Sequence, residues 1–163
     1  MDFIQIGALQ CILMETLEST KDTPKYSAIE LLLEYDITPT QQRVEIANIL
    51  FARPQHVSAE QVLSQLNSEQ QKASKATIYN TLGLFARKGL IREIIVDPTK
   101  VFYDSNTSDH HHYYNVDTGM LSDIEDGYML VSNLPALPEG TVAERVDIIY
   151  RVRNADNAAD NIQ

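Results

Sequence analysis

Three of the four histidines in the chain are consecutive: His110, His111 and His112 follow Asp109 and precede two tyrosines. Imidazole nitrogens bind divalent metal ions and haem iron. The run opens a stretch typical of a β-strand, in which successive side chains point to opposite faces. We therefore expect His110 and His112 to share one face and His111 to lie on the other, so that an ion or a haem iron could be held from either face. A solvated strand edge is the alternative; an expression tag is not typically internal.

A second group of chemically capable residues lies on a predicted helix over residues 74–88. Apolar residues recur there at helical spacing, after Ser74, a capping residue type, and before Gly89, a helix-ending one. The polar side near the helix start carries Lys75, Thr77, Tyr79 and Asn80. Lysine suits a phosphate or guanine, threonine a thymine methyl, tyrosine a phosphate or sugar, and asparagine can pair with adenine. Solvated side chains on a surface helix are the alternative.

The elements around this helix indicate how it would be used. Residues 38–41 (TPTQ) predict a helix start with Thr38 as N-cap and Pro39 as first helical residue, and residues 58–61 (SAEQ) form a capping box for another helix. The runs LIREIIV and VFYD, separated by residues 97–100 (DPTK), predict a hairpin with a four-residue turn. Three helices followed by a hairpin predict a winged helix-turn-helix, whose third helix enters the DNA major groove.

The charge distribution indicates two parts. The net charge of -10 argues against a nucleic-acid partner, but the balance is -4 for residues 1–35, +1 for residues 36–104 and -7 for residues 105–163. Only the middle part could approach a polyanion, which places a boundary near residues 104–109.

The late segment 142–152 predicts a half-buried strand. Val142, Val146, Ile148, Tyr150 and Val152 face one way there, and arginines and an aspartate face the other. The expected class is α+β, with an N-terminal winged helix-turn-helix followed by a small α/β domain. The expected parts are an N-terminal extension (1–26), the winged-helix domain (27–104), the α/β dimerisation and sensing domain (109–153) and a disordered tail (154–163).

Composition excludes several classes of protein. One cysteine, Cys11, cannot form an internal disulfide or a Cys-based zinc ribbon. No apolar run approaches the roughly 18 residues of a membrane span, and the acidic N-terminus is not typical of a signal peptide, so a cytoplasmic protein without membrane contact is expected. We expect no enzyme, because the sequence offers no nucleophile paired with a base, no glycine-rich phosphate loop and no glutamate placed as a base beside the histidines.

Four segments, taken in order over about residues 37–153, resemble the ferric uptake regulator family of dimeric, metal-responsive transcription factors. They are ITPTQQRVEIANIL, HVSAEQVL, SKATIYNTLGLFARKGLI and HHHYYNVDTGMLSDI. The HHHYY run and the later PALPEG are most similar to the iron response regulator branch, which responds to haem. The resemblance implies a winged-helix domain followed by an α/β dimerisation domain.

The departures from the family pattern are at two places. Asn115 and Thr118 stand where many members have a CxxC pair, so no structural zinc is expected there. Cys11 is followed by Ile12 rather than by the proline of a Cys-Pro haem motif, and it lies among apolar residues at helical spacing. A small buried thiol is the preferred interpretation of Cys11.

The resemblance also implies a ligand set. His56, Asp97, His110 and His112 match ligand positions of the family's regulatory metal site, and Asp123 matches a family acid. Imidazole and carboxylate together suit iron, manganese or zinc, and haem remains a second possible ligand of the histidines.

We therefore expect a homodimeric regulator of iron or haem genes that binds a palindromic, AT-rich double-stranded DNA operator. Arg43, from the helix that follows residues 38–41, and Lys100, from the wing, join the four residues of the third helix as expected DNA contacts. The resemblance implies activity when iron is scarce and loss of DNA binding when haem arrives. A sensor of metal alone with the same fold, and a metal-dependent enzyme, are the alternatives.

Overall fold

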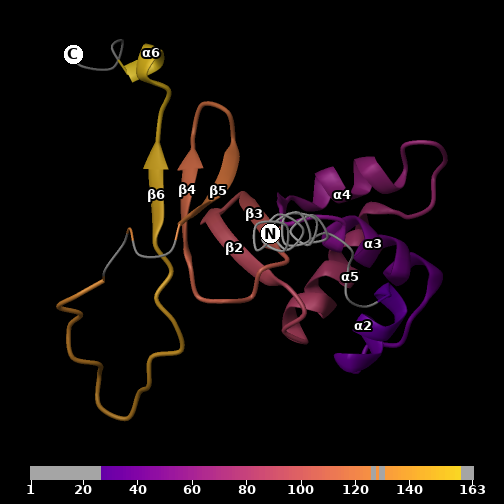
Figure 1. Cartoon of the computed structure of the whole chain (residues 1–163), viewed down its shortest axis with the longest axis horizontal. Coiled ribbons are helices and arrows are strands. Elements are labelled where there is room, and N and C mark those ends of the chain that lie inside the picture. Colours follow the sequence, from indigo (N-terminus) through magenta and orange to yellow (C-terminus); the bar gives the residue numbers. More distant parts are fainter. Residues whose placement is uncertain (1–26, 126–127, 129–130, 159–163) are drawn as a thin grey trace, which may run out of the picture.

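The computed structural model describes residues 27–125, 128 and 131–158, so Cys11 and the rest of the N-terminal extension lie outside the described residues. Within the described part, the first four helices gather at one side of two three-stranded sheets, and a short fifth helix lies beyond the last strand on the other side (Figure 1). The helices are α2 (Ala28–Glu34), α3 (Gln41–Phe51), α4 (Ala59–Leu66), α5 (Lys75–Arg87) and a short C-terminal α6 (Ala155–Ala158). One sheet has the order β1-β3-β2, with β1 (His56–Val57), β2 (Arg92–Asp97) and β3 (Lys100–Asp104). The other has the order β5-β4-β6, with β4 (His111–Asn115), β5 (Met120–Ile124) and β6 (Ile149–Val152). The α+β class and the helices-then-wing order are confirmed.

Two predicted helix starts are confirmed by their caps. At α4, the Ser58 hydroxyl accepts from the Gln61 N–H, and the Gln61 side chain accepts from the Ser58 N–H. At α5, the Ser74 hydroxyl accepts from the Thr77 N–H, and Gly89 follows the helix with a φ of 74°. Each cap thus supplies an acceptor for a backbone amide at the helix start that the helix itself leaves unpaired.

The helical part differs from the prediction in two places. α3 begins two residues late: its N-cap is Thr40, whose hydroxyl accepts from the Arg43 N–H, and Thr38 and its proline lie outside the helix. An additional helix, α2, begins at a capping box formed by Ser27 and Glu30. The N-cap was assigned to the wrong threonine because both threonines are competent caps and the local sequence does not choose between them.

The core of the helical part fixes the orientation of α5. Its buried side chains come from helices α2 to α5 and from β3, among other segments. They include Leu32, Ile46, Leu50, Val62, Ile78, Leu82, Phe85 and Tyr103. Because Ile78, Leu82 and Phe85 face inward, Lys75, Tyr79 and Asn80 are left exposed on the opposite side of α5.

A two-residue strand, β1, connects α3 to α4 and was not predicted. It pairs antiparallel with β3, so that His56 lies opposite Asp104 and Val57 opposite Tyr103. A strand of two residues is too short to show a period in the sequence. Its pairing is nevertheless what carries His56 to the edge of the wing.

The wing hairpin has a tighter turn than predicted. Asp97 pairs with Lys100, so only Pro98 and Thr99 form the turn instead of four residues. The Asp97 carboxylate accepts from both the N–H and the hydroxyl of Thr99, which stabilises this short connection.

The last strand is shorter than predicted and faces the other way. β6 begins at Ile149, whereas Val142 lies outside it with 90% exposure. Tyr150 is 56% exposed, and Ile149 packs inward, so the predicted inward face is wrong. Parallel pairing with β4, which sets His112 beside Ile149, decides the facing, and alternation alone does not reveal which face meets the core.

The C-terminal tail also departs from the prediction. A short helix, α6, occupies part of the region where disorder was predicted, and residues 159–163 lie outside the described residues. No helix in the described part of the chain is long and apolar enough to cross a membrane.

The wing packs face to face against the C-terminal sheet. A second apolar core joins Ile94, Val96 and Phe102 of the wing to Tyr114 and Leu121 of the other sheet. Figure 1 shows β2 and β3 next to β4 and β5. The hairpin therefore follows the helices of the winged-helix part in the sequence, and its inner face packs against the C-terminal sheet.

The Ser58 cap allows a direct test of the helical part. We expect Ser58→Ala to lower the free energy of unfolding by about 1 kcal/mol, because the Gln61 N–H at the start of α4 loses its hydroxyl acceptor. Ser64→Ala, an exposed change within the same helix, is the matched control and should be neutral or slightly stabilising. Urea unfolding followed by circular dichroism measures both, and equal stabilities for the two variants would contradict the capping assignment.

Candidate metal centre

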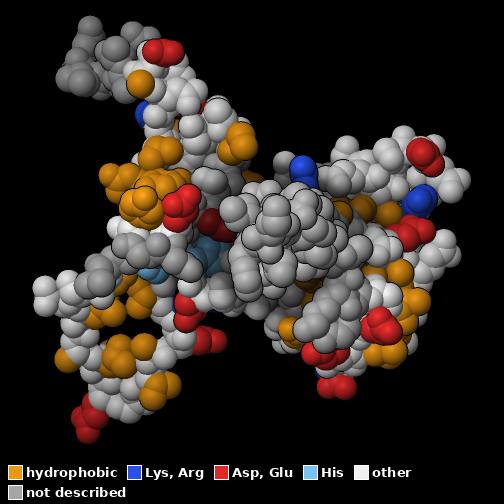
Figure 2. Space-filling model, viewed as in Figure 1, with side chains coloured by type: hydrophobic (Ala, Val, Ile, Leu, Met, Phe, Trp, Pro, Cys, Tyr) orange, Lys and Arg blue, Asp and Glu red, His pale blue; other side chains and the backbone are white. Residues whose placement is uncertain are grey.

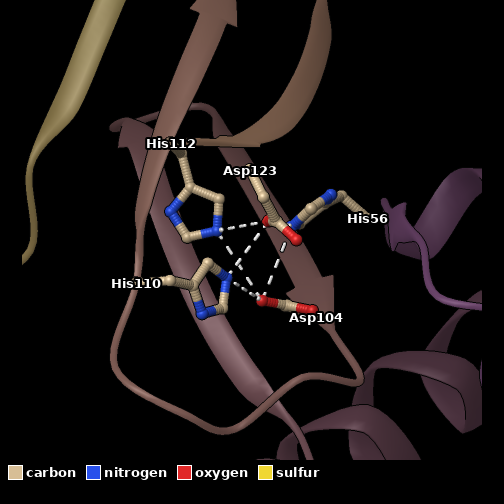
Figure 3. A group of neighbouring side chains, drawn as sticks. All are labelled: His56, Asp104, His110, His112 and Asp123. Carbon is tan, nitrogen blue, oxygen red and sulfur yellow. Dashed lines mark ion pairs between the residues drawn. The ribbon is translucent and has the colours of Figure 1, made fainter. Parts of the chain in front are cut away.

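Five side chains from both sheets converge where the wing meets the C-terminal sheet (Figure 3). They are His56 from β1, Asp104 from the end of β3, His110 just before β4, His112 from β4 and Asp123 from β5. One ligand atom from each residue lies within 4.8 Å of every other. Residues that are 67 positions apart in the sequence, from His56 to Asp123, are thus brought to one point.

Strand register accounts for each position. His110 and His112 are buried on the same face of β4, as predicted from alternation, and His111 lies on the other face. Asp123 is the residue of β5 directly opposite His112. Asp104 is opposite His56 in the β1–β3 pair. Two antiparallel pairs therefore supply the donors, and the packing of the wing on the C-terminal sheet brings them together.

The carboxylates lie among the imidazole nitrogens. Asp104 Oδ2 is 3.0 Å from His110 Nε2, 3.5 Å from His56 Nε2 and 3.6 Å from His112 Nε2. Asp123 Oδ1 is 2.9 Å from His56 Nε2, 3.1 Å from His110 Nε2 and 3.6 Å from His112 Nε2. Each oxygen thus contacts all three imidazoles, which is a shared centre rather than a set of separate pairs.

These short distances do not correspond to hydrogen bonds. Within the described part of the chain, the three Nε2 atoms and Asp104 Oδ2 are buried and have no hydrogen-bond partner of acceptable geometry. Buried polar atoms in native proteins are nearly always paired. Nitrogens and oxygens that lie this close and yet are misaligned for hydrogen bonding point toward a common centre, as the ligands of a cation do. The residues therefore fit a metal ion.

The pKa values of two members agree with a site that attracts positive charge. Burial by itself raises the pKa of Asp104, but the close imidazoles of His112 and His56, together with the hydrogen bond from the Asn106 N–H, outweigh it and hold that pKa well below its usual range. Burial lowers the pKa of His56, but Asp104 and Asp123 outweigh it and raise that pKa. The acid stays ionised, and a metal ion would compete with a proton for His56.

A supporting contact orients one of the histidines. His110 Nδ1 lies 2.9 Å from the Ser108 carbonyl oxygen, to which it can donate, leaving Nε2 free as the ligand atom. The Arg92 guanidinium donates to the same carbonyl and lies 2.8 Å from an Asp147 carboxylate oxygen. The ring orientation of His110 is thereby fixed by the backbone and not by the ion.

The structure corrects the expected ligand set. Asp97 lies at the tip of the wing, outside the cluster, and its carboxylate bonds to Thr99. Asp104 takes its place as the acid from the wing, and His111 lies outside the cluster as well. Asp104 could have been found from the alternation of β3, whose last residue points to the same side as Phe102, but only if the packing partner of that face were known.

The site has a cleft on one side. A cleft of about 740 Å³ is lined by Asp104, Asp123, His56 and residues of the α3–β1 connection. The Asp123 side chain is 45% exposed, whereas the His112 side chain is 1% exposed. An ion from solvent can therefore reach the donors from the Asp123 side.

The expected DNA contacts divide into two groups. Lys75, Tyr79 and Asn80 are exposed along one side of α5, and Thr77 is half-buried beside Ser74. In the free protein, Tyr79 donates to Glu60 at 2.6 Å, and Lys75 lies 3.3 Å from the same carboxylate.

The other two expected contacts are engaged elsewhere. Arg43 donates to the Thr38 carbonyl oxygen at 2.8 Å. Lys100 donates to the Tyr114 hydroxyl at 2.7 Å, at the contact between the sheets, and it also lines a hollow together with Tyr79 and Glu60.

Known proteins resemble this chain in both sequence and fold. The peroxide operon regulator of Bacillus subtilis is 31% identical over 96 residues, covering 59% of this chain and 66% of that protein. The ferric uptake regulation protein of Synechococcus elongatus is 38% identical over 77 residues, covering 46% of this chain and 52% of that protein. The chain thus spans between about half and two thirds of the length of the curated relatives it matches.

Solved structures share the fold. The ferric uptake regulator from Pseudomonas aeruginosa, solved with manganese, has a TM-score of 0.59 at 23% identity and covers 80% of this chain and 99% of that one. A zinc-bound manganese uptake regulator has a TM-score of 0.55 at 21% identity, covering 78% and 99%. Residues 34–134, more than half of the chain, match the sequence profile of the Ferric uptake regulator family. This chain is therefore a member of the ferric uptake regulator family.

Proposed function

We propose that this protein is a DNA-binding transcription regulator whose operator affinity is set by a divalent metal ion held between the winged helix and the C-terminal sheet. The observation that carries the proposal is the cluster of five donor atoms, which draws on both parts of the chain. The names of the relatives support it, since they include a peroxide operon regulator and a ferric uptake regulation protein. A regulator is proposed and not an enzyme, because these relatives are regulators.

The donor set explains how an ion would act on helix α5, the proposed DNA-reading helix. A divalent ion would supply two positive charges that balance the two carboxylates. His56 and Asp104 belong to the winged-helix part, and His110, His112 and Asp123 belong to the C-terminal sheet. Without a cation, Asp104 and Asp123 repel each other across the contact, which favours separation of the two parts. The five ligands thus tie the orientation of α5 to ion occupancy.

The geometry favours a divalent ion over haem iron as the ligand of this cluster. A porphyrin fills four positions around its iron and leaves two, on opposite faces of the ring. Five donors within 4.8 Å of one another leave no room for such a ring. Control of iron or haem genes by haem rests on the likeness of the HHHYY and PALPEG segments to the iron response regulator branch, and it remains the alternative that a titration distinguishes.

DNA recognition is proposed to come from the N-terminal half of α5. Asn80 can pair with adenine in bidentate fashion, and Tyr79 and Lys75 can contact the backbone once they leave Glu60. The expected operator is AT-rich and double-stranded. Thr77 and Arg43 complete this group of proposed contacts.

A homodimer is proposed because apolar side chains remain uncovered on the C-terminal part. Figure 2 shows them gathered over β6 and along the extended segment that precedes it. They include Tyr150, Leu134, Leu137 and Val142, each more than half exposed. Exposed apolar area of this kind commonly marks a protein interface. A two-fold dimer would present two α5 helices to a palindromic operator.

One titration tests the proposed function. An operator is selected from random duplex DNA with the full chain, and its affinity is measured with Mn²⁺, Zn²⁺, Fe²⁺ or haem added separately, each binding event being followed by absorption or calorimetry. We expect a divalent ion to bind at a single high-affinity site per chain and to change operator affinity. Binding of every ion without any effect on DNA would reject the regulator, and an effect of haem alone would favour the alternative.

The two faces of β4 give a matched pair of histidine variants. We expect His112→Ala to abolish high-affinity ion binding and the ion's effect on the operator, because a buried ligand is lost. His111→Ala removes the neighbouring imidazole on the other face and should leave ion affinity nearly unchanged. Calorimetric titration with Mn²⁺ compares them; if His111→Ala were the more damaging change, the ligand would lie on the outer face of the sheet.

The two aspartates of the wing give a second matched pair. We expect Asp104→Asn to weaken Mn²⁺ binding by more than the roughly 10- to 100-fold that loss of a supporting residue costs, because a charged ligand becomes neutral. Asp97→Asn should change it little, because Asp97 lies outside the cluster and an amide oxygen still accepts from Thr99. Equal losses in the two variants would show that Asp97 moves to the ion and that the corrected ligand set is wrong.

For DNA recognition, we expect Asn80→Ala to weaken operator binding by roughly 1–3 kcal/mol, because the bidentate contact with adenine is lost. Its affinity for unrelated duplex DNA and for Mn²⁺ should not change, since Asn80 pairs with a base in the proposal and is not one of the five ion ligands. Gel-shift competition between operator and unrelated DNA measures the difference. An unchanged preference for the operator would show that Asn80 does not contact its bases.

A further inference from the structure

The facing sides of β3 and β4 carry a ladder of contacts that extends beyond the metal centre. Alternation places Lys100, Phe102 and Asp104 on one face of β3. On β4 it places Tyr114 and His112 on the face that meets them. The Asp104 end of this ladder is the ion cluster, and the Lys100 end is the tip of the wing.

At the wing tip, the ammonium group of Lys100 contacts the buried side chain of Tyr114. Lys100 Nζ lies 2.7 Å from the Tyr114 hydroxyl oxygen and 5.4 Å from the centre of its ring. Tyr114 is 2% exposed, so its hydroxyl depends on a partner inside the protein. The Arg151 guanidinium lies 5.2 Å from the same ring and donates to the Val96 carbonyl oxygen at 3.1 Å. Lys100 and Arg151 thereby fasten both strands of the wing to the C-terminal sheet.

Between the two polar ends, the ladder is apolar. The ring centres of Phe102 and Tyr114 are 6.3 Å apart, and Ile94 and Val96 of β2 pack against the same tyrosine. A packed apolar layer transmits small displacements because it has no space to absorb them. Strand β3 is therefore held at both ends, by Asp104 at the ion cluster and by Lys100 at the wing tip.

We propose that Tyr114 is a positioning residue that couples the ion site to the wing by holding Lys100, so that Lys100 serves this interdomain contact and not the DNA backbone. The inference rests on the proposed function, because it assigns a role within ion-controlled DNA binding. Tyr114 reaches no ligand atom of the cluster; it acts through the orientation of β3. Loss of its hydroxyl should free the wing tip while the ion ligands stay intact.

Tyr114→Phe removes only the hydroxyl, and Tyr113→Phe, on the opposite face of the same strand, is the matched control. Amide hydrogen exchange of residues 97–103 in the full chain, with and without Mn²⁺, reports local opening of the wing without any DNA. In wild type and in Tyr113→Phe, we expect Mn²⁺ to slow exchange at the wing tip. In Tyr114→Phe, we expect this slowing to fall at least about fivefold, while Mn²⁺ affinity changes little. Equal slowing in both variants overturns the inference.

DNA binding provides the second measurement. The ratio of operator affinities with and without Mn²⁺ should fall about fivefold or more in Tyr114→Phe, within the usual range of coupling between sites. Lys100→Met should lower this ratio by a similar factor. The double variant should lower it no further than either single variant, because both changes remove the same interaction. If Lys100 instead contacts phosphate, Lys100→Met lowers affinity for all DNA and reduces the salt slope by about 0.9 while Tyr114→Phe leaves the ratio unchanged, which overturns the inference.

The two measurements separate the inference from the proposed function. If wild type gains protection at the wing tip with Mn²⁺ and Tyr114→Phe loses it, but Mn²⁺ never changes the operator affinity of wild type, the proposed function fails and the coupling through Tyr114 stands. If Mn²⁺ changes operator affinity equally in wild type and Tyr114→Phe, the proposed function stands and the coupling fails.

Discussion

The structure depends on one electrostatic constraint: two carboxylates and three imidazoles share a small volume in which the three Nε2 atoms and Asp104 Oδ2 have no hydrogen-bond partner among the described residues. Asp104 is nearly fully buried and ionised, and an uncompensated buried charge is among the most costly features a fold can carry. A cation at the common centre removes that cost. The packing of the two sheets is therefore favourable to the extent that positive charge is present between them, and this is the physical basis of the proposed response to metal.

The wing has a double role that follows from this packing. Its outer edge belongs to the winged-helix domain, and its inner face, with Ile94, Val96 and Phe102, forms part of the core shared with the C-terminal sheet. The apolar layer keeps the sheets in register, and the polar groups at its two ends decide how firmly they are held. Under the proposed function, the orientation of α5 relative to the C-terminal sheet depends on these groups of the wing, while Lys75, Tyr79 and Asn80 stay exposed on α5.

The turn between β4 and β5 shows how this chain supports its sensing sheet where other family members are expected to use thiolates. Asn115 accepts from the Asp117 and Thr118 N–H groups and donates to the Asn154 side chain. Asp117 accepts from the Asn154 N–H and lies 3.3 Å from Arg153 Nη1. These bonds join the end of β4 to the chain that follows β6. Hydrogen bonds between short polar side chains thus hold this end of the sheet, and the expectation that no zinc binds at Asn115 and Thr118 stays a prediction.

The sequence by itself determined the features that depend on near neighbours: the caps at Ser58 and Ser74, the wing, and the shared face of His110 and His112, because capping and alternation act over a few residues. The family followed from motifs in a fixed order. Only the tertiary structure decided that Asp104 and not Asp97 reaches the histidines, that Lys100 faces Tyr114, and that Ile149 rather than Tyr150 packs against the second core. These outcomes depend on the register between strands distant in sequence and on which faces of two sheets meet. A periodic pattern shows that a strand has two faces, but the partner that covers one of them is supplied by packing elsewhere in the chain.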